Sequence, residues 1–424
     1  MIPMKFIREN PQLVRDAIRD KCEKRGNVDR LLELDEQSRQ LTAVADELKN
    51  QRNLASREIG RLQKANEDAS ESIAAMQQVS ARVKELDSEL RDLDSELQEE
   101  LLYIPNLPHP EVPVGTSEAD NREVSLYGEP RLFDFEPLDH LQLSERHRLL
   151  DMLRGAKITG SGFPLYRGDG ARLERALINF MLDLHTREHG FEEVFTPFVA
   201  NADAMRGTGQ IPKLVDDMYH IGLDDLYLIP TAEVTITNIF QGEILTEQEL
   251  PQSLAGYSAC FRREAGSYGK DNRGLLRVHQ FNKVEMVKLV KPEESEAELE
   301  LLRSYAEKVL QLLGIHYRVV ELCTADLSFA AARCYDLEAW APGEGKFLEV
   351  SSCSNFLDFQ ARRANIRYRD TTTGKVCFVH TLNGSGLATS RLLVALIETW
   401  QNRNGTITIP EALRPWFDGR ETIG

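Results

Sequence analysis

Hydrophobic residues recur at every seventh position from about residue 29 to about residue 100, and charged residues fill most positions between them. Two stripes share this spacing, Leu34, Leu41, Leu48, Ala55 and Leu62 in the first half and Met76, Val83, Leu90 and Leu97 in the second, where Val79, Leu86 and Leu93 supply the complementary a/d position. Residues 65–70 interrupt the stripe and supply helix-capping side chains. The pattern therefore predicts two helices of about 35 residues that fold back into an antiparallel coiled coil.

A proline-rich segment follows the predicted hairpin. It runs from Ile104 to Pro113 and contains four prolines, which end any helix and indicate a linker. We expect an N-terminal domain of residues 1–104 and a C-terminal domain of residues 105–424. The second domain mixes amphipathic helices, such as 172–189, with β-rich runs, such as 345–350 and 376–380. Its periodicity predicts mixed α and β structure and no particular topology.

Composition excludes several classes of protein. No apolar stretch approaches the roughly 18 residues needed to cross a bilayer, and the first ten residues resemble neither a signal nor a transit peptide. The six cysteines include no C-x-x-C pair, so we expect reduced, mostly buried thiols. A cytoplasmic protein without membrane contact is the expectation.

The charge is strongly acidic overall but uneven along the predicted hairpin. The net charge is −17, so any nucleic acid must meet a local basic patch. Five cations lie close to the predicted hairpin tip with Glu58 as the only acid among them, namely Lys49, Arg52, Arg57, Arg61 and Lys64. This patch is either a solvated helix face or a surface that contacts phosphates.

Two common nucleotide-binding motifs are missing from the sequence. Gly374-Lys375 is followed by Val376 and lacks the upstream glycine of a P-loop. No strand-linked G-x-G-x-x-G with a downstream acid occurs either. If the protein binds ATP, it does so by other means.

The run Phe261-Arg262-Arg263-Glu264-Ala265-Gly266 and the run from Asn383 to Arg391 together resemble motifs 2 and 3 of class II aminoacyl-tRNA synthetases, in the seryl-tRNA synthetase form. Motif 1 corresponds to about 172–199, motif 2 to about 257–285 and motif 3 to about 380–398. The resemblance extends over essentially the whole chain. It implies an α+β fold in which an antiparallel sheet is flanked by helices, with the coiled-coil hairpin as an N-terminal arm.

The resemblance also implies an ATP site with Mg²⁺. Arg262 and Arg391 would be the catalytic arginines, because an arginine fork stabilises charge that develops on phosphorus. The other residues implied for ATP are Arg263, Glu264, Phe281, Glu349, Val350, Ser351 and Ser352, of which Glu349 and Ser352 would hold the metal. Arg391 is expected to open a helix after a glycine-rich turn at 384–386, and the loop 267–274 is expected to order over ATP.

A pocket for L-serine is implied in the same way. Thr231-Ala232-Glu233 matches the T-x-E signature of the family, and Glu285 is the second acid. With Arg262, Asn383 and Ser385 these residues would hold the α-ammonium and the hydroxyl of serine, and either acid could take either group. A pocket built to hydrogen-bond a hydroxyl should reject alanine by on the order of 10⁴-fold.

The implied reaction is serylation of tRNA(Ser), and by analogy of tRNA(Sec), through a seryl-adenylate. The arm would grip the long variable arm of the tRNA, and the motif 1 helix and strand imply a homodimer. Three alternatives remain. A synthetase-like ligase could load a carrier protein, although such ligases lack a long arm. The heptads alone would fit a non-catalytic coiled-coil interaction protein. His185-Thr186-Arg187-Glu188-His189 also fits the H-x-x-E-H pattern of some zinc peptidases.

Overall fold

The computed structural model describes residues 1–265 and 273–424 and divides into two compact units. One unit contains residues 1–19 and 23–105, and the other contains residues 20–22 and 106–424. Most of the loop predicted to order over ATP, residues 267–272, lies outside the described residues. No helix in the described part of the chain is long and apolar enough to cross a membrane.

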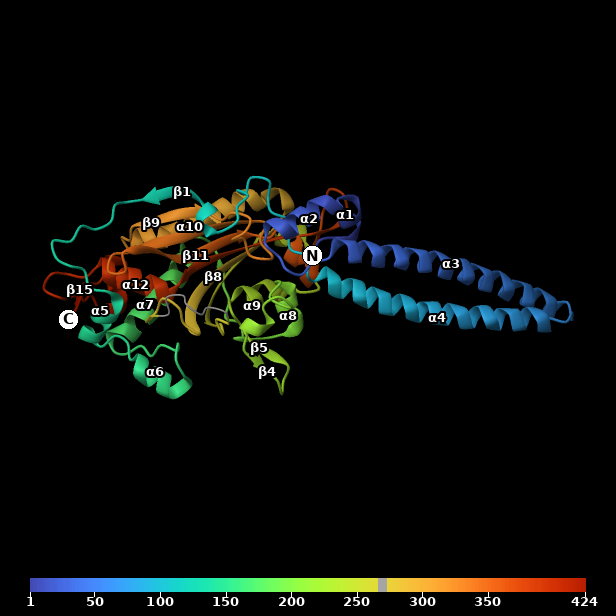
Figure 1. Ribbon diagram of the computed structural model, residues 1–424, viewed down its shortest axis with the longest axis horizontal. Coiled ribbons are helices and arrows are strands. Elements are labelled where there is room, and N and C mark those ends of the chain that lie inside the picture. The colour runs from blue at the N-terminus through green and yellow to red at the C-terminus, as the bar shows by residue number, and fades with distance from the viewer. Residues whose placement is uncertain (266–272) are drawn as a thin grey trace. The chain divides into compact units, whose positions relative to one another are not determined.

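The N-terminal unit is helical. Its elements are α1 (Met4–Glu9), α2 (Pro11–Asp20), α3 (Val28–Lys64) and α4 (Ser70–Leu101). The Asn27 side chain caps α3 by accepting a hydrogen bond from the Arg30 N–H at 3.0 Å. Helices α3 and α4 run side by side as a hairpin, which confirms the predicted antiparallel arm (Figure 1).

The seam between α3 and α4 contains a second stripe that the sequence analysis did not identify. Leu31, Ala45 and Ile59 of α3 are buried and lie fourteen residues apart. The sevenfold positions between them are Ser38 and Arg52, so no unbroken apolar repeat marks this stripe. Arg52, one of the five predicted cations, is therefore half-buried at the seam, where the alkyl part of its side chain can be covered while the guanidinium stays in water.

We expect Leu86→Ala to destabilise the hairpin locally by about 2–5 kcal/mol, because Leu86 is fully buried in the seam. Native-state hydrogen exchange of the α3 and α4 amides in the full chain would measure this effect. Leu54→Ala is the matched control, since Leu54 lies on α3 with 55% of its surface exposed. Equal losses of protection in both variants would contradict the assigned seam.

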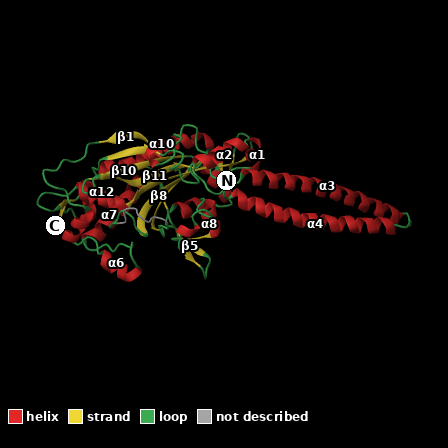
Figure 2. Cartoon of the chain, viewed as in Figure 1, coloured by secondary structure: helices red, strands yellow, loops and turns green. Residues whose placement is uncertain are grey.

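The second unit is built on an eight-stranded sheet (Figure 2). The order is β1 (Arg122–Tyr127), β9 (Tyr317–Glu321), β10 (Arg333–Ala341), β11 (Lys346–Asn355), β14 (His380–Ala388), β8 (Gln280–Val290), β7 (Gln252–Phe261) and β2 (Glu192–Glu193). All neighbours are antiparallel except β2, which is parallel to β7. The expected antiparallel sheet is confirmed.

Three helices cover one face of this sheet, α7 (Asp169–Arg187), α10 (Ser295–Leu312) and α12 (Thr389–Thr399). Strand alternation explains how the sheet separates apolar from polar contacts. On β8, Val284 and Met286 join the core beneath the helices, whereas Phe281 and Lys283 face the opposite side, where they line a cleft.

Shorter elements surround the sheet. The helices are α5 (His140–His147), α6 (Met152–Thr159), α8 (Ala202–Gly207), α9 (Glu233–Thr237) and α11 (Phe359–Ala364); the strands are β3 (Val199–Asn201), β4 (His220–Ile221), β5 (Leu226–Leu228), β6 (Ile244–Thr246), β12 (Arg367–Arg369), β13 (Val376–Phe378), β15 (Ile407–Thr408) and β16 (Thr422–Ile423). The β-rich run 376–380 belongs to two strands, β13 and the start of β14. The chain changes sheets at Val379, because β13 pairs with β12 while His380 pairs with Val290 of β8.

The predicted turn at 384–386 is wrong, because these residues continue strand β14. A side chain at Gly384 would place Cβ 3.2 Å from the Cys353 sulfur, and one at Gly386 would place it 2.5 Å from His185 Nε2. The glycines therefore allow close packing beneath the strand rather than a reversal of the chain. The helix that carries Arg391, α12, does begin directly after β14.

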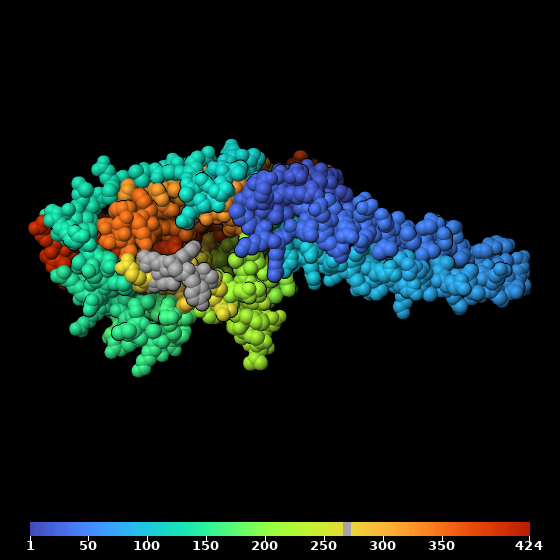
Figure 3. Space-filling view, in the orientation of Figure 1, coloured from blue at the N-terminus to red at the C-terminus, as the bar shows by residue number. Residues whose placement is uncertain are grey.

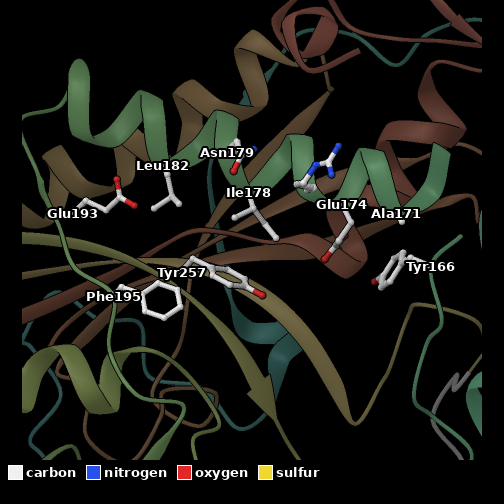
Figure 4. Close-up of a pocket in the computed structure, with 10 residues that line it drawn as sticks. Tyr166, Ala171, Glu174, Ile178, Asn179, Leu182, Glu193, Phe195 and Tyr257 are labelled. Atoms are coloured by element: carbon white, nitrogen blue, oxygen red, sulfur yellow. The ribbon is translucent and has the colours of Figure 1, made fainter. Parts of the chain in front are cut away.

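A pocket of about 510 Å³ lies against α7 and includes a buried acid, Glu174 (Figure 4). Glu174 Oε1 accepts a hydrogen bond from Asn282 Nδ2 at 2.7 Å and another from the Thr389 hydroxyl, so it joins α7 to β8 and α12. Its Oε2 and the Tyr166 hydroxyl have no hydrogen-bond partner among the described residues. Burial raises the pKa of Glu174 to about 7.

Glu174→Gln should flatten the pH dependence of stability. The folded pKa of about 7 lies above the ordinary 4.5, so the free energy of unfolding falls as the pH rises from about 4.5 through about 7. The ionised form costs on the order of 3 kcal/mol above that range, and the amide cannot ionise. Thermal unfolding at about pH 5 and about pH 8 measures the difference, with exposed Glu192→Gln as control. Parallel pH dependence in wild type and Glu174→Gln would overturn the assignment.

Candidate active site

The sheet face opposite α7, α10 and α12 opens onto a cleft of about 1110 Å³. Figure 3 shows the surface hollowed between the orange residues of β10 and β11 and the yellow-green residues of α8 and α9. Most of the predicted site residues line this cleft, namely Thr231, Glu233, Arg262, Glu264, Phe281, Glu349, Val350, Ser351, Ser352, Asn383, Ser385 and Arg391. They come from separate segments between residues 231 and 391 that the fold brings together.

Arg262 follows the last residue of β7 and is held by backbone groups. Its N–H donates to the His279 carbonyl at 3.0 Å, and its Nε donates to the Pro230 carbonyl at 3.3 Å. The guanidinium carbon lies 5.1 Å from the centre of the Phe281 ring, within the range of a cation–π contact. Backbone contacts and ring thus aim a permanent positive charge into the cleft.

The buried acid Glu285 belongs to a cluster that includes a lysine the sequence analysis missed. Lys283 forms an ion pair with Glu285 and donates a hydrogen bond to Thr231 Oγ1 at 2.7 Å. The Thr231 hydroxyl in turn donates to Glu285 Oε2 at 2.9 Å. The spacing on β8 could have identified Lys283, since Phe281, Lys283 and Glu285 alternate along one face of a strand. The negative charge of Glu285 is therefore balanced within the protein.

Glu233 is the second buried acid, at the first residue of α9. Its backbone N–H donates to Thr231 Oγ1 at 3.2 Å, and its Oε1 accepts a hydrogen bond from Gln360 Nε2 at 2.6 Å. Burial, followed by the nearby negative charge of Glu285, raises the pKa of Glu233 to about 7. No ion pair of Glu233 occurs among the described residues, so a cation would stabilise its ionised form.

Arg391 and Glu349 meet at another wall of the cleft. Arg391 Nη1 lies 3.1 Å from Glu349 Oε2, and its Nε donates to the Leu276 carbonyl at 3.0 Å. Ser352 Oγ lies 3.1 Å from the Cys334 sulfur. Asp336, which the sequence analysis missed, also lines this wall, and desolvation together with Glu349 raises its pKa well above the usual range. Its position opposite Ser352 across the β10–β11 ladder could not be read from the sequence.

Several predicted residues do not line the cleft. Arg263 Nη1 instead donates to the Asp216 carbonyl at 3.3 Å, Ala232 is fully buried, and Glu285 lies beneath the surface with no exposed area. Val350 borders the cleft, but its side chain is in the core beneath the helices. Glu264 does line the cleft, in an ion pair with Arg277 that the sequence analysis did not anticipate.

Two residues predicted for the serine pocket have a buried acceptor atom without a hydrogen-bond partner among the described residues. These atoms are Glu285 Oε1 and Asn383 Oδ1. Leaving such atoms unpaired costs about 1–3 kcal/mol each. Asn383 lines the cleft and Glu285 lies beneath it, so these two acceptor atoms are candidates for the donor groups of a ligand.

The H-x-x-E-H motif begins on α7 and ends at His189, two residues beyond it, and it belongs to no group of three possible metal ligands among the described residues. His185 Nδ1 lies 2.9 Å from His189 Nδ1, and burial lowers the pKa of His185 to about 3. The group of three possible metal ligands found among the described residues is a different one, formed by His140, Glu344 and Glu398. His140 Nε2 there accepts the Leu275 N–H at 3.3 Å, and its Nδ1 lies 3.1 Å from Glu344 Oε1, so protein groups already occupy both ring nitrogens.

Comparisons with known proteins agree with this geometry. Residues 1–108 match the family model of the seryl-tRNA synthetase N-terminal domain, and residues 219–400 match that of the class II tRNA synthetase core domain (G, H, P, S and T). Serine–tRNA ligases of Desulforamulus reducens and Geobacter sulfurreducens are 54% and 52% identical, each over 100% of both chains.

A solved structure has the same fold over the whole chain. The crystal structure of seryl-tRNA synthetase from Pyrococcus horikoshii complexed with ATP superposes with a TM-score of 0.94 at 38% identity, covering 100% of this chain and 99% of that one. Prolyl-tRNA synthetase from Giardia lamblia has a TM-score of 0.56 at 16% identity over 65% of this chain, and this likeness concerns the fold alone. Full-length relatives, both family models and the cleft lead to one conclusion: the chain belongs to the seryl-tRNA synthetase family.

Proposed function

We propose that this protein activates L-serine with ATP and transfers it to the 3′ end of tRNA(Ser). The observation that carries the proposal is the cleft with its arginine and two buried acids. Arg262 lies against the Phe281 ring. Of the two acids, Glu285 has an ion pair with Lys283, whereas Glu233 has none among the described residues. The serine carboxylate attacks the α-phosphorus, pyrophosphate leaves, and the terminal ribose hydroxyl of the tRNA then displaces AMP. The two alternatives, a carrier-protein ligase and a binding protein without catalysis, lose support because relatives over the full length are serine–tRNA ligases.

We assign the α-ammonium and the hydroxyl of serine to the two acids from their charge balance. Glu285 is neutralised by Lys283, whereas the side chain of Glu233 is bonded, among the described residues, only to a neutral amide. The α-ammonium therefore goes to Glu233, where it relieves an uncompensated buried charge. The serine hydroxyl donates to the unpaired Glu285 Oε1. Asn383 Oδ1 and Ser385 supply further polar contacts at the same wall, and Ala232 shapes the pocket through its backbone.

The arginines serve the phosphates. Arg262 is placed to bridge the serine carboxylate and the α-phosphate, and its fixed charge stabilises the negative charge that accumulates during attack. Arg391 approaches from α12 toward the outer phosphates, while Phe281 and Glu264 contact the adenine ring and its amino group. Arg263 acts from outside the cleft, by holding the chain after β7 against the segment around Asp217 through a 2.8 Å backbone hydrogen bond.

Mg²⁺ fits the wall formed by Glu349 and Ser352. A carboxylate and a hydroxyl are the hard oxygen donors that this ion prefers, and the Glu349 side chain is half-exposed beside the phosphate-binding Arg391. The ion supplies positive charge to the phosphate oxygens when it is bound. Strand β11, which carries Glu349, Val350, Ser351 and Ser352, pairs with β14, where Asn383 lies opposite Ser354. This pairing keeps the wall in register with the proposed serine pocket, and Ser351 Oγ adds a hydrogen bond to the Ser385 carbonyl at 2.7 Å.

The N-terminal arm is proposed to bind the tRNA. Lys49 and Arg61 are paired with acids of the arm, Asp87 and Glu58, and Arg52 lies at the seam. Arg57 and Lys64 are exposed and have no ion pair among the described residues, so they are the cations most available to phosphates. The same contacts, which depend on shape rather than base sequence, would admit tRNA(Sec) as well.

We also propose a cytoplasmic homodimer. The apolar side chains of Leu153, Ile158 and Phe195 are 87%, 74% and 78% exposed, so they are available for contact with a second subunit. The motif 1 helix α7 lies beside Phe195 at the pocket in Figure 4. Cytoplasm is where the proposed substrates, ATP and tRNA, occur together.

Amino-acid-dependent ATP–pyrophosphate exchange tests the proposed function. Exchange should require Mg²⁺ and serine and should be absent with alanine, glycine and threonine. Arg262→Ala should reduce it at least 10³-fold, because the developing charge loses its partner. Arg403→Ala is the control, since Arg403 is an exposed arginine paired with Asp134 away from the cleft. Near-normal exchange in folded Arg262→Ala would refute its role, and no exchange by the wild type with any amino acid would refute the function.

Arg57→Ala combined with Lys64→Ala should raise the KM for tRNA in aminoacylation and lower the salt slope of tRNA binding by about 2. Pyrophosphate exchange, which needs no tRNA, should stay unchanged. Lys84→Ala provides a matched control, because Lys84 is an exposed lysine on the acidic helix α4. If Arg57 and Lys64 both proved dispensable for tRNA affinity, the arm would have another partner.

A further inference from the structure

Gln360 lies on α11, outside the cleft, and is fully buried. Its side-chain amide has three partners. Nε2 donates to Glu233 Oε1 at 2.6 Å and to the Thr208 carbonyl at 3.3 Å, and Oε1 accepts from the Thr381 hydroxyl at 2.7 Å. Both amide hydrogens and the carbonyl oxygen are therefore used.

These partners allow only one orientation of the amide. An ionised carboxylate and a backbone carbonyl only accept hydrogen bonds, so the NH₂ group must face Glu233 and Thr208. The oxygen then faces Thr381, whose hydroxyl has to donate. Because Gln360 is locked at both ends, Glu233 is locked as well, and its carboxylate cannot rotate without breaking a short, buried hydrogen bond.

We propose that Gln360 is a positioning residue for the amino-acid pocket, which orients Glu233 and keeps it as a carboxylate beneath the substrate ammonium. This inference rests on the proposed function, since Glu233 is the proposed partner of the ammonium. Thr381 lies on β14, two residues before Asn383, and its hydroxyl holds the oxygen end of the Gln360 amide. A single buried amide thus ties the Glu233 wall of the pocket to the Asn383 wall.

The charges around Glu233 explain why it needs a donor. Glu285 and Lys283 of β8 and Arg262 after β7 are the charged groups that face it. Lys283 is already bound to Glu285 and Thr231, and Arg262 is directed to the Pro230 carbonyl and the Phe281 ring. The Gln360 N–H favours the ionised form of Glu233, whose pKa is about 7 even with this hydrogen bond.

Loss of the Gln360 donor should therefore raise the pKa of Glu233 further. At neutral pH more of the protein would carry a neutral Glu233, which binds an ammonium weakly. The KM for serine should fall as the pH rises through about 7 in the wild type, since Glu233 becomes ionised there. Without the donor, the same fall should occur about one pH unit higher.

The test compares Gln360→Met, Thr381→Val and Gln401→Met in serine-dependent pyrophosphate exchange between about pH 6 and about pH 8.5. Gln360→Met keeps the shape of the side chain and removes the amide. Thr381→Val leaves the Glu233 hydrogen bond possible but releases the other end of the amide. Gln401→Met is the matched control, because Gln401 is also a buried glutamine with hydrogen-bonded amide groups, in contact with Leu138 and Glu398.

Gln360→Met should raise the KM for serine at pH 7 by roughly tenfold and shift its pH midpoint upward, with the KM for ATP unchanged. Thr381→Val should cause a smaller change in the same direction. Gln401→Met should leave the midpoint unchanged, whatever its effect on the melting temperature. An unmoved midpoint in both folded Gln360→Met and folded Thr381→Val, or the same shift in Gln401→Met, would overturn the proposal. Absence of serine-dependent exchange in the wild type would instead refute the proposed function.

Discussion

Two carboxylates, Glu233 and Glu285, lie buried on one side of the sheet, and the rest of the site depends on how their charge is accommodated. Like charges in a poorly hydrated space disfavour ionisation of one another. Lys283 and the Thr231 hydroxyl compensate the charge of Glu285. The carboxylate of Glu233 accepts a hydrogen bond from the neutral Gln360 amide and has no ion pair among the described residues. This inequality leaves Glu233 without an ion pair among the described residues and Glu285 with one, and the proposed assignment of the serine ammonium and hydroxyl rests on that difference.

The opposite face of the sheet makes this arrangement possible. Helices α7, α10 and α12 bury an apolar layer against β8, β11 and β14, so alternate side chains of the same strands are free to carry polar groups into the cleft. Gly384 and Gly386 let β14 approach that layer closely. Glu174 is one of the buried polar residues within it, and its bonds to Asn282 and Thr389 join the strand that carries Lys283 to the helix that carries Arg391.

Predictions from the sequence succeeded where a local pattern has a single physical meaning. The heptads predicted the hairpin because an unbroken seven-residue period fits few other structures. Helix α3 ends at Lys64 and α4 begins at Ser70, at the two edges of the expected break. The second stripe of α3 was missed because Ser38 and Arg52 interrupt it. The turn predicted at 384–386 was wrong for a related reason: glycine serves both reversals and close packing, and the packing partners, Cys353 and His185, are distant in sequence.

The sequence by itself determined the arm, the α+β class of the second unit and the residue types that gather in the cleft, since each follows from periodicity or from short motifs. Only the tertiary structure decided how the charges are shared. That Lys283 balances Glu285, that Arg263 turns away from the cleft, and that Gln360 reaches Glu233 across 127 positions of the chain all depend on which strands and helices meet. Electrostatic and hydrogen-bond energies fall steeply with distance in space, and distance in space is not encoded in any local stretch of sequence.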